Sequence, residues 1–527
     1  MKKNKIILLC IFTFALFLRL YGLNWDQGNH LHPDERYLTM VASDIKLPKS
    51  ISQYFDTSSS PLNPGNYENY KFFVYGTFPL FVTKIFAVIF NLDDYENIVL
   101  VGRILSAFFD SGIIIILYKI SKRYLASIVY ATTVLPIQLS HFFTVDTFLS
   151  FFILLTFYFL TKKRFLYSGI AFGLALACKI SALYFLPVVF IFFIINRRFL
   201  SAFYFLLFAA IFFRIFQPYA FTGIFSLNPI FVNSLKQLQV ITVPSVYFPP
   251  SVQWMSKIKL LFPLQNIVIF GLGIPLSIAI LFIKKLKPNI INILSLVWIV
   301  LLFVYQGTQP VFTMRYFLPI YPFIVLIISQ IIPSKYFKYV LIPHLIYCIM
   351  FLTVYSIPHT RVQASNWINQ NIPIDSVLTT ESWDDSIPLN NISYKIVTLE
   401  ITGPDTSQKW DKVKNDLNSI DYLILSSNRS WASAANVPHL LPDTSNFYNK
   451  LFSQKPLIEI NSYPGIRLPI KNCYYFGPTN MPNDKSWFAV NKKCNYPGIY
   501  FRDDLAEEAF SVYDHPKVLI FKNNISN

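Results

Sequence analysis

The stretch Asn29-His30-Leu31-His32-Pro33-Asp34-Glu35-Arg36-Tyr37 follows directly on the first apolar segment, residues 6–21, and organises our interpretation of the chain. An acidic pair beside a histidine is unusual where a chain leaves a membrane. Because Asp34 and Glu35 are adjacent, we expect only one of them to point into a given pocket. Two interpretations stay open: a carboxylate base at the membrane surface, or an acidic start to an interfacial helix after Pro33.

The composition is that of a membrane protein. Of 527 residues, 54% are hydrophobic, 17% aromatic and only 14% charged, and the mean hydropathy is +0.44. Soluble proteins carry roughly a quarter charged residues. We therefore predict a polytopic α-helical membrane protein. The net charge of +17 lies largely in short clusters between apolar runs, which indicates membrane orientation and no nucleic-acid partner.

The basic clusters decide how to interpret the apolar run 72–92. This run is long enough to span a bilayer. If it spans, most clusters fall outside; if it lies in the interface, all fall inside, as the positive-inside rule favours. Lys84 and Pro79 within it also suit an interfacial helix. The clusters are Lys119/Lys122/Arg123, Lys162/Lys163/Arg164, Arg197/Arg198, Lys284/Lys285/Lys287 and Lys335/Lys338.

This topology gives about eleven transmembrane helices in a membrane domain over residues 1–357, with a cytoplasmic N-terminus in the plasma membrane. The predicted spans are 6–22, 99–118, 124–142, 144–161, 165–178, 180–195, 199–216, 260–283, 289–305, 316–332 and 338–357. Outside lie the loop 23–98, the corner at Asp146, the loop 217–259 and the tail, with Lys179 and Arg315 at hairpin tips on the same side. Charged residues from distant parts of the chain thus converge on one face, and ionisable residues at membrane depth are usually functional.

The tail, residues 358–527, differs in composition. Short apolar runs rich in β-formers alternate with polar stretches and two helical patterns, which predicts an extracytoplasmic α/β domain. The expected strands are 376–380, 394–401, 422–426, 457–462 and 517–522, and the expected helices 362–370 and 406–417. Cys473 and Cys494 lie in this tail, and the sequence leaves open whether they pair. No Walker, G-x-G-x-x-G, H-E-x-x-H or C-x-x-C motif supports a nucleotide or zinc-protease function.

Five motifs in order resemble the GT-C glycosyltransferases, in particular bacterial or archaeal enzymes of the dolichyl-phosphate-mannose-protein mannosyltransferase and aminoarabinose transferase type. They are His32-Pro33-Asp34-Glu35-Arg36-Tyr37, Ser140-His141-Phe142-Phe143-Thr144-Val145-Asp146-Thr147, Arg315-Tyr316-Phe317-Leu318-Pro319-Ile320-Tyr321-Pro322, Glu381-Ser382-Trp383-Asp384-Asp385 and Val512-Tyr513-Asp514-His515-Pro516. The resemblance implies inverting transfer of a sugar from a polyprenyl-phosphate donor to a hydroxyl of a protein, lipid or glycan acceptor.

The resemblance also implies roles for single residues. Asp34 would be the base that activates the acceptor, with Glu35 beside it as a like charge that keeps a carboxyl pKa from falling too low. Lys179 and Arg315 would hold the anionic leaving group. The remaining candidates for substrate or phosphate binding are Arg36, Lys71, Asp146, His32 and His141.

Structural interpretations stand beside these roles. Asp146 could cap the following helix, Arg315 could anchor a helix end, and Lys179 could break a hairpin. The motifs at 383–385 and 513–515 are expected to be structural turns of the tail.

A divalent metal is possible, since the acids and histidines of the first two motifs could gather. However, the loop 217–259 holds no Asp, Glu or His, and we predict no required cofactor.

Two other functional classes remain. A transporter or flippase for lipid-linked sugars would use the same charges as a polar path, but it should show internal repeats and broken helices at mid-membrane. A receptor that binds a ligand with its tail would need fewer helices.

Overall fold

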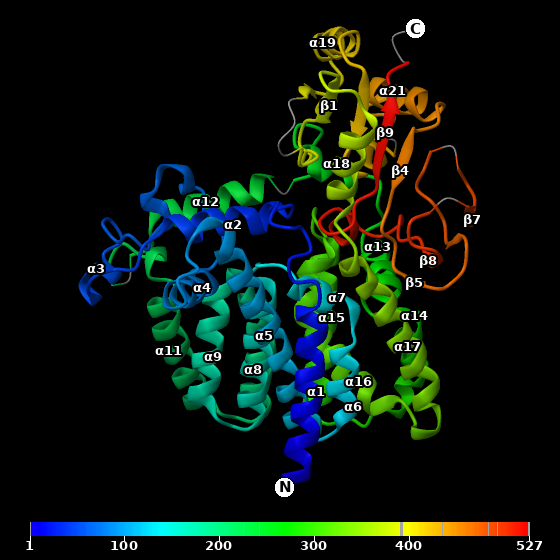
Figure 1. The fold of residues 1–527 in the computed structure, drawn as a ribbon. Coiled ribbons are helices and arrows are strands. Elements are labelled where there is room, and N and C mark those ends of the chain that lie inside the picture. Colours follow the sequence, from blue (N-terminus) through cyan, green and yellow to red (C-terminus); the bar gives the residue numbers. More distant parts are fainter. Residues whose placement is uncertain are drawn as a thin grey trace.

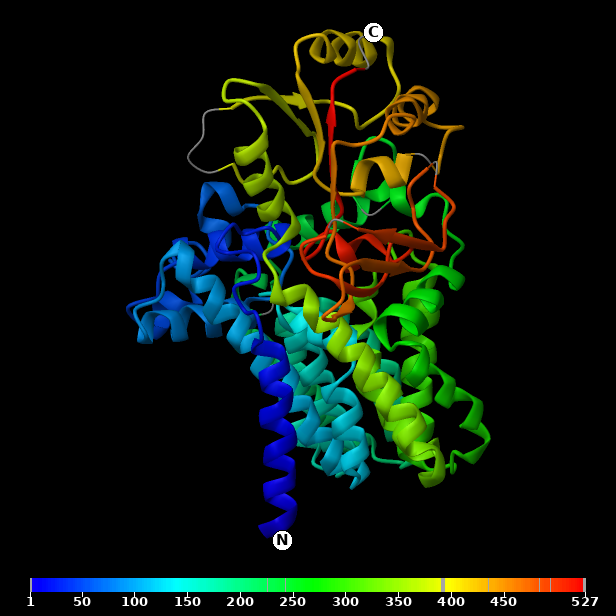
Figure 2. The same cartoon turned by 45° about the vertical axis from the view of Figure 1, so that its right-hand side comes forward.

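The computed structural model describes residues 2–224, 226–241, 243–389, 394–434, 436–482, 484–492 and 494–524. It shows a helical bundle with the tail over one end (Figure 1). The N-terminus lies at the opposite end of the bundle in both views (Figure 2). This is the predicted architecture, a polytopic helical membrane protein with a C-terminal α/β domain.

Helices occupy every predicted span. By length and composition, five helices in the described part of the chain are long and apolar enough to cross a membrane, or up to six if a bent pair counts as one span. Several others are shorter apolar helices of 10–17 residues. The helices of the bundle are α1 (Lys2–Leu20), α5 (Tyr95–Ser121), α6 (Tyr124–Ala131), α7 (Val134–Ser140), α8 (Asp146–Thr161), α9 (Phe165–Cys178), α10 (Leu186–Ile195), α11 (Phe199–Phe216), α13 (Leu261–Asn266), α14 (Ile274–Ser277), α15 (Ile290–Thr308), α16 (Tyr321–Ile331) and α17 (Phe337–Leu352).

Two predicted spans are not single straight helices. The span 124–142 is divided into α6 and α7 by a break at Thr132 and Thr133. The span 260–283 bends by 112° between Leu261–Gly271 and Ile274–Lys285. The bend falls at Gly273, whose φ of +82° is a conformation that residues with a side chain rarely adopt.

The basic loops share one end of the bundle, as the topology requires. The loop between α8 and α9 and the loop between α16 and α17 lie at the end that holds the N-terminus (Figure 1). The Arg123 guanidinium donates to the Ser329 carbonyl (3.0 Å), and the Tyr124 hydroxyl to the Asn4 carbonyl (3.5 Å). These contacts bring the loop between α5 and α6 to the same end.

Four helices of the outer loops gather at the other end (Figure 1): α2 (Pro33–Asp44), α3 (Ile51–Phe55), α4 (Thr77–Ile89) and α12 (Pro229–Ile241). The N–H of Gly76, just before α4, donates to the Cys178 carbonyl at the end of α9 (3.0 Å). Lys84 of α4 is buried and contacts the Ser43 carbonyl (3.2 Å) and Asp93 (3.3 Å). This placement agrees with an apolar run that stays at the bundle end and does not cross it.

The tail contains a five-stranded sheet in the order β2-β1-β3-β9-β4. β1 pairs in parallel with β2 and β3, and β9 runs antiparallel between β3 and β4. These strands coincide with the five predicted ones. Their bounds are β1 (Val377–Glu381), β2 (Lys395–Leu399), β3 (Tyr422–Leu425), β4 (Ile458–Ile460) and β9 (Val518–Lys522). The helices of the tail are α18 (Thr360–Asn371), α19 (Ser407–Leu417), α20 (Arg429–Ala434), α21 (Pro442–Phe452) and α22 (Glu508–Ser511).

A second sheet, in the order β5-β8-β6-β7, was not predicted. Its strands have only three or four residues each, too few to show an alternating pattern in the sequence. They are β5 (Gly465–Arg467), β6 (Cys473–Phe476), β7 (Phe488–Asn491) and β8 (Gly498–Phe501). A disulfide between Cys473 and Cys494 ties this sheet together, which answers the question that the sequence left open.

The tail packs closely on the outer loops. Val252, in the short helix η5 (Pro249–Trp254), is buried in the same apolar cluster as Leu399 and Trp431 of the tail. The loop 217–259 therefore supplies part of the tail's core. The domain boundary at residue 357 stays a prediction.

Candidate active site

The acidic pair opens α2. Pro33 is the first residue of this helix, and the His32 side chain before it accepts a hydrogen bond from the Glu35 N–H (3.3 Å). The interpretation of this stretch as an acidic start to a helix is thus confirmed, and a carboxylate base at this place stays a prediction. Successive helix residues point about 100° apart, so Asp34 and Glu35 face different surroundings.

Glu35 lies in a closed cluster. Its carboxylate accepts two hydrogen bonds from the Arg103 guanidinium (2.8 and 2.7 Å) and one from the Phe143 N–H (2.7 Å). Asp26 bonds the same guanidinium (3.0 and 2.9 Å), and the side chains of Arg103, Asp26 and Glu35 are at most 2% exposed. Glu35 is therefore held in the protein interior, and the structure leaves Asp34 alone as the candidate base of the pair.

Asp34 is accessible. Its side chain is 24% exposed, forms an ion pair with Arg315, and accepts a hydrogen bond from the Tyr75 hydroxyl (2.9 Å). Burial raises the pKa of Asp34, but Arg315, His32 and Tyr75 outweigh burial and hold this pKa well below its usual range. The expectation that the like charge of Glu35 keeps a carboxyl pKa of the pair from falling too low does not hold for Asp34, because Glu35 is paired with Arg103 and Asp34 with Arg315.

A second ion pair lies beside the first. Lys179 donates to the Asp146 carboxylate (2.8 Å), and these side chains are 23% and 4% exposed. Tyr316 connects the two pairs, since its ring centroid is 4.4 Å from the Lys179 ammonium and 5.4 Å from the Arg315 guanidinium. Asp146 begins α8 as its first residue, but its side chain holds a cation in place and does not cap the helix.

A cavity of about 460 Å³, here called the central cavity, opens beside the second pair. Its polar lining includes Asp146, Lys179 and Tyr316, with Gln306 and Gln309. The rest of its wall is largely apolar and includes Leu149, Ile153, Leu183, Trp298, Leu302 and Pro319. A largely apolar cavity that also presents a lysine suits a lipid that carries a phosphate.

The other predicted residues lie elsewhere. Arg36 pairs with Asp385 of the tail (2.8 Å), and Lys71 lies half-exposed beside Glu68 (3.9 Å), on a different pocket. The His141 ring stacks on Tyr355 at 3.9 Å, with its nitrogens facing backbone carbonyls. His32 is buried, and its ring packs at a tilt on that of Tyr513, with centroids 4.0 Å apart. These four residues lie outside the central cavity.

Sequence reasoning missed how the tail holds the site. The buried Glu507 carboxylate accepts hydrogen bonds from the Thr313 hydroxyl (2.9 Å) and the Met314 N–H (3.1 Å), directly before Arg315. Burial raises the pKa of Glu507 to about 7, against these hydrogen bonds. The signal in the sequence was only a pair of adjacent acids, Glu507 and Glu508, in a polar segment.

The motif at 513–515 is a buried junction. Asp514 accepts hydrogen bonds from the Tyr355 hydroxyl (2.7 Å) and the Gln138 amide (3.0 Å) of the bundle. It also pairs with His515, whose other ring nitrogen contacts Asp503 (2.7 Å), and these carboxylates raise the pKa of His515 to about 10 although burial lowers it. The motif at 383–385 is held by arginines, because Asp384 and Asp385 pair with Arg361 of the tail and Asp385 also pairs with Arg36 of the first outer loop.

The acids and histidines of the first two motifs do not gather around a shared point. Asp34, Glu35 and Asp146 each pair with a different cation. In the part of the chain that the structure describes, no group of three His, Cys, Asp or Glu side chains could hold a metal ion. That the enzyme requires no metal stays a prediction.

Residues 77–221, which carry Asp146 and Lys179, match the family model described as dolichyl-phosphate-mannose-protein mannosyltransferase. None of the curated proteins compared with the chain matches its sequence. Among solved structures 15 chains match. The oligosaccharyltransferase of Archaeoglobus fulgidus in the apo form has a TM-score of 0.49 at 13% identity, over 93% of this chain and 75% of that one. ArnT from Cupriavidus metallidurans bound to undecaprenyl phosphate has a TM-score of 0.38 at 11% identity, over 76% of this chain and 93% of that one.

The bundle and the tail define a polytopic helical membrane protein with a C-terminal α/β domain. Over residues 77–221 the chain is similar to dolichyl-phosphate-mannose-protein mannosyltransferases. Over these residues the match confirms the resemblance predicted from the sequence. None of these findings supports the transporter alternative.

Proposed function

We propose that this glycosyltransferase moves a sugar from a polyprenyl-phosphate donor to an acceptor hydroxyl at the outer membrane face, with inversion at the anomeric carbon. The observation that carries the proposal is that two partly exposed ion pairs, Asp34–Arg315 and Asp146–Lys179, meet at Tyr316, and that the second pair and Tyr316 line the central cavity. Such a site offers both a base and two cations.

The cations suit the leaving group. A polyprenyl monophosphate is already anionic when it departs, so it needs positive charge and no acid. Arg315 and Lys179, which both lie close to the Tyr316 ring, supply that charge. The apolar wall of the central cavity accommodates the first part of the lipid chain.

The ion pair of Asp34 links donor binding to base strength. In the free protein Arg315 keeps Asp34 ionised and weakly basic. A donor phosphate competes for the Arg315 guanidinium, and loss of this partner raises the pKa of Asp34. The Asp34 carboxylate then takes the proton of the acceptor hydroxyl, and the oxygen of that hydroxyl bonds to the anomeric carbon. At the same time the bond between the anomeric carbon and the phosphate oxygen breaks.

The test is Asp34→Asn in purified protein in nanodiscs, assayed for sugar transfer from a polyprenyl-phosphate donor. The amide keeps the size of the side chain but takes no proton, so turnover should fall by about 10²–10⁴-fold. Donor affinity should stay the same or increase, because an amide competes less strongly for Arg315.

The matched control is Asp44→Asn in the same helix. Asp44 accepts a hydrogen bond from the Tyr70 hydroxyl (2.5 Å), and the amide oxygen can still accept it. Near wild-type turnover is expected for this variant. If Asp34→Asn also kept near wild-type turnover, Asp34 would not be the base.

A further inference from the structure

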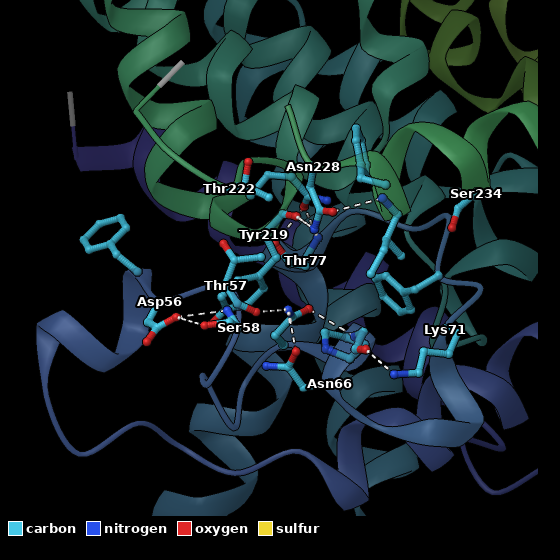
Figure 3. Close-up of a pocket in the computed structure, with 18 residues that line it drawn as sticks. Asp56, Thr57, Ser58, Asn66, Lys71, Thr77, Tyr219, Thr222, Asn228 and Ser234 are labelled. Atoms are coloured by element: carbon cyan, nitrogen blue, oxygen red, sulfur yellow. Dashed lines mark hydrogen bonds between the residues drawn. The ribbon is translucent and has the colours of Figure 1, made fainter. Parts of the chain in front are cut away.

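A second cavity, here called the loop pocket, lies between residues 55–77 of the first outer loop and residues 217–234 after α11 (Figure 3). Its volume is about 340 Å³, which is within the range of small-molecule sites. Polar side chains from both segments converge on it, among them Asn66 and Thr77 from one side and Asn228 and Ser234 from the other.

Hydrogen bonds between side chains and backbone fix the walls of the loop pocket. The Asn63 amide donates to the Thr57 carbonyl (2.7 Å), and the Asn228 amide donates to the Tyr219 carbonyl (2.9 Å). The pocket is therefore formed before a ligand arrives, which lowers the entropy cost of binding.

Gln217 presents an amide donor to the loop pocket. Its side-chain oxygen accepts hydrogen bonds from the Thr77 N–H (2.6 Å) and hydroxyl (2.7 Å), which fixes the orientation of the amide. The amide nitrogen makes no hydrogen bond to any residue that the structure describes, and it is not one of the fully enclosed side-chain nitrogens that lack a partner, although Gln217 as a whole is only 4% exposed and lines the pocket. The nitrogen is therefore open to the pocket, where a ligand oxygen can accept its hydrogen bond.

The remaining lining is mostly neutral and aromatic. Phe55, Phe73 and Phe231 contribute rings, and only Asp56 and Lys71 are charged. The Asp56 carboxylate already accepts hydrogen bonds from the hydroxyls of nearby serines (2.6 Å each). Amides and hydroxyls beside aromatic faces match a ring of hydroxyl groups with apolar C–H faces, whereas an anionic ligand would find one half-exposed lysine.

The loop pocket and the central cavity share a wall. Phe73 lines the loop pocket, and its neighbour Val74 lines the central cavity. In α12, Ser234 lines the loop pocket, and Leu235 lines the central cavity. A molecule seated in the loop pocket is therefore one layer of side chains away from the cavity with Lys179.

We propose that the loop pocket binds a neutral carbohydrate and that this carbohydrate is part of the acceptor, so that the enzyme glycosylates a glycan or a glycolipid. That the carbohydrate is an acceptor rests on the proposed function. That the loop pocket binds a carbohydrate does not depend on sugar transfer.

Binding is tested with full-length protein in nanodiscs on a printed array of neutral oligosaccharides. The Asp34→Asn background prevents transfer during the measurement. Phe231→Ala removes one ring, and Gln217→Glu keeps the acceptor for Thr77 but replaces the free amide donor. Each should weaken binding of the selected oligosaccharide by at least about tenfold. Val240→Ala, at the exposed end of the same helix and outside both cavities, should bind normally.

The source of the carbohydrate is tested by comparing the free oligosaccharide with the same oligosaccharide on a lipid carrier. If Phe231→Ala loses affinity equally for the free and the lipid-linked oligosaccharide, the site recognises the sugar alone. If the variant loses affinity only for the lipid-linked oligosaccharide, the site binds a glycolipid.

Transfer kinetics separate this inference from the proposed function. Phe231→Ala should raise the KM for a carbohydrate acceptor and leave slow hydrolysis of the donor by water unchanged. If the wild-type protein binds no oligosaccharide on the array, or if Phe231→Ala binds as well as Val240→Ala, the inference is wrong. If binding follows the expected pattern but no donor is consumed, the proposed function fails and the carbohydrate site stands.

Discussion

Two arginine–carboxylate centres lie close to the start of α2, and they differ in how far they are closed to solvent. Arg103 is fully buried between Asp26 and Glu35, and its guanidinium bonds both carboxylates. Arg315 is 18% exposed, and among the described residues it makes one side-chain hydrogen bond, to Asp34. A guanidinium has five donors, so Arg315 retains capacity for a ligand and Arg103 does not. Exposure and the number of partners therefore distinguish the closed centre at Arg103 from the open one at Arg315.

The largest effect is expected at the closed centre. Arg103→Met leaves two buried carboxylates without their cation, and breaking such a pair costs about 3–5 kcal/mol of unfolding free energy. The variant should lose most of its folded fraction in detergent, measured by size-exclusion chromatography and by Tm. Adding Asp26→Asn and Glu35→Gln to Arg103→Met gives a triple variant without the excess negative charge. This variant should recover part of the stability. A Tm close to that of the wild type for Arg103→Met alone would contradict the distinction between the two centres.

At the open centre the effect should fall on activity and not on folding. Arg315→Gln removes a cation from the leaving group and should lower turnover by about 10²–10³-fold, with Tm nearly unchanged because the ion pair with Asp34 is partly exposed. Transfer assays and thermal melts on the same preparation measure both quantities. Arg36→Gln is the comparison, since Arg36 pairs with Asp385 and touches neither Asp34 nor the central cavity. Equal losses of turnover in Arg315→Gln and Arg36→Gln would contradict a role of Arg315 in binding the leaving group.

A third carboxylate sharpens the comparison because it is buried without a cation. Among the described residues Glu507 has hydrogen-bond donors but no ion-pair partner. Since burial raises its pKa to about 7, the folded protein binds this proton more tightly than the unfolded chain. The stability that this proton contributes is fully present below the unfolded pKa of about 4.5 and is lost as the pH rises through about 7.

Glu507→Gln removes this titration. The free energy of unfolding of the wild type, relative to that of the variant, should fall by about 1–3 kcal/mol between pH 5 and pH 8. Chemical unfolding in detergent at several pH values measures the difference. Parallel pH profiles for the two proteins would show that the proton on Glu507 is not linked to folding.

The sequence predicted the parts of the fold that have strong periodic signals. Long apolar runs and basic clusters located the helices of the bundle and the shared end of its loops, and alternating runs located the main sheet of the tail. The bend at Gly273 and the small second sheet depend on local backbone geometry and on three- and four-residue strands, which leave little pattern in a sequence.

The site was predictable residue by residue but not as pairs. The sequence singles out Asp34, Asp146, Lys179 and Arg315, and they do lie together, because the predicted topology places all four at the same end of the bundle. That Glu35 faces away and that Arg315 lowers the pKa of Asp34 follow from side-chain directions and partners. Partners such as Arg103, an ordinary charged residue inside an apolar helix, were visible in the sequence but were not recognised.

The hydrogen bonds of Glu507 to Thr313 and Met314 also have a consequence for biosynthesis. The ribosome makes Asp34 and Arg315 long before it makes Glu507. Glu507 can reach its partners only after it has left the ribosome and the tail has folded against the bundle. It follows that a chain arrested before residue 507 lacks these hydrogen bonds beside Arg315 even when its helices are already in place.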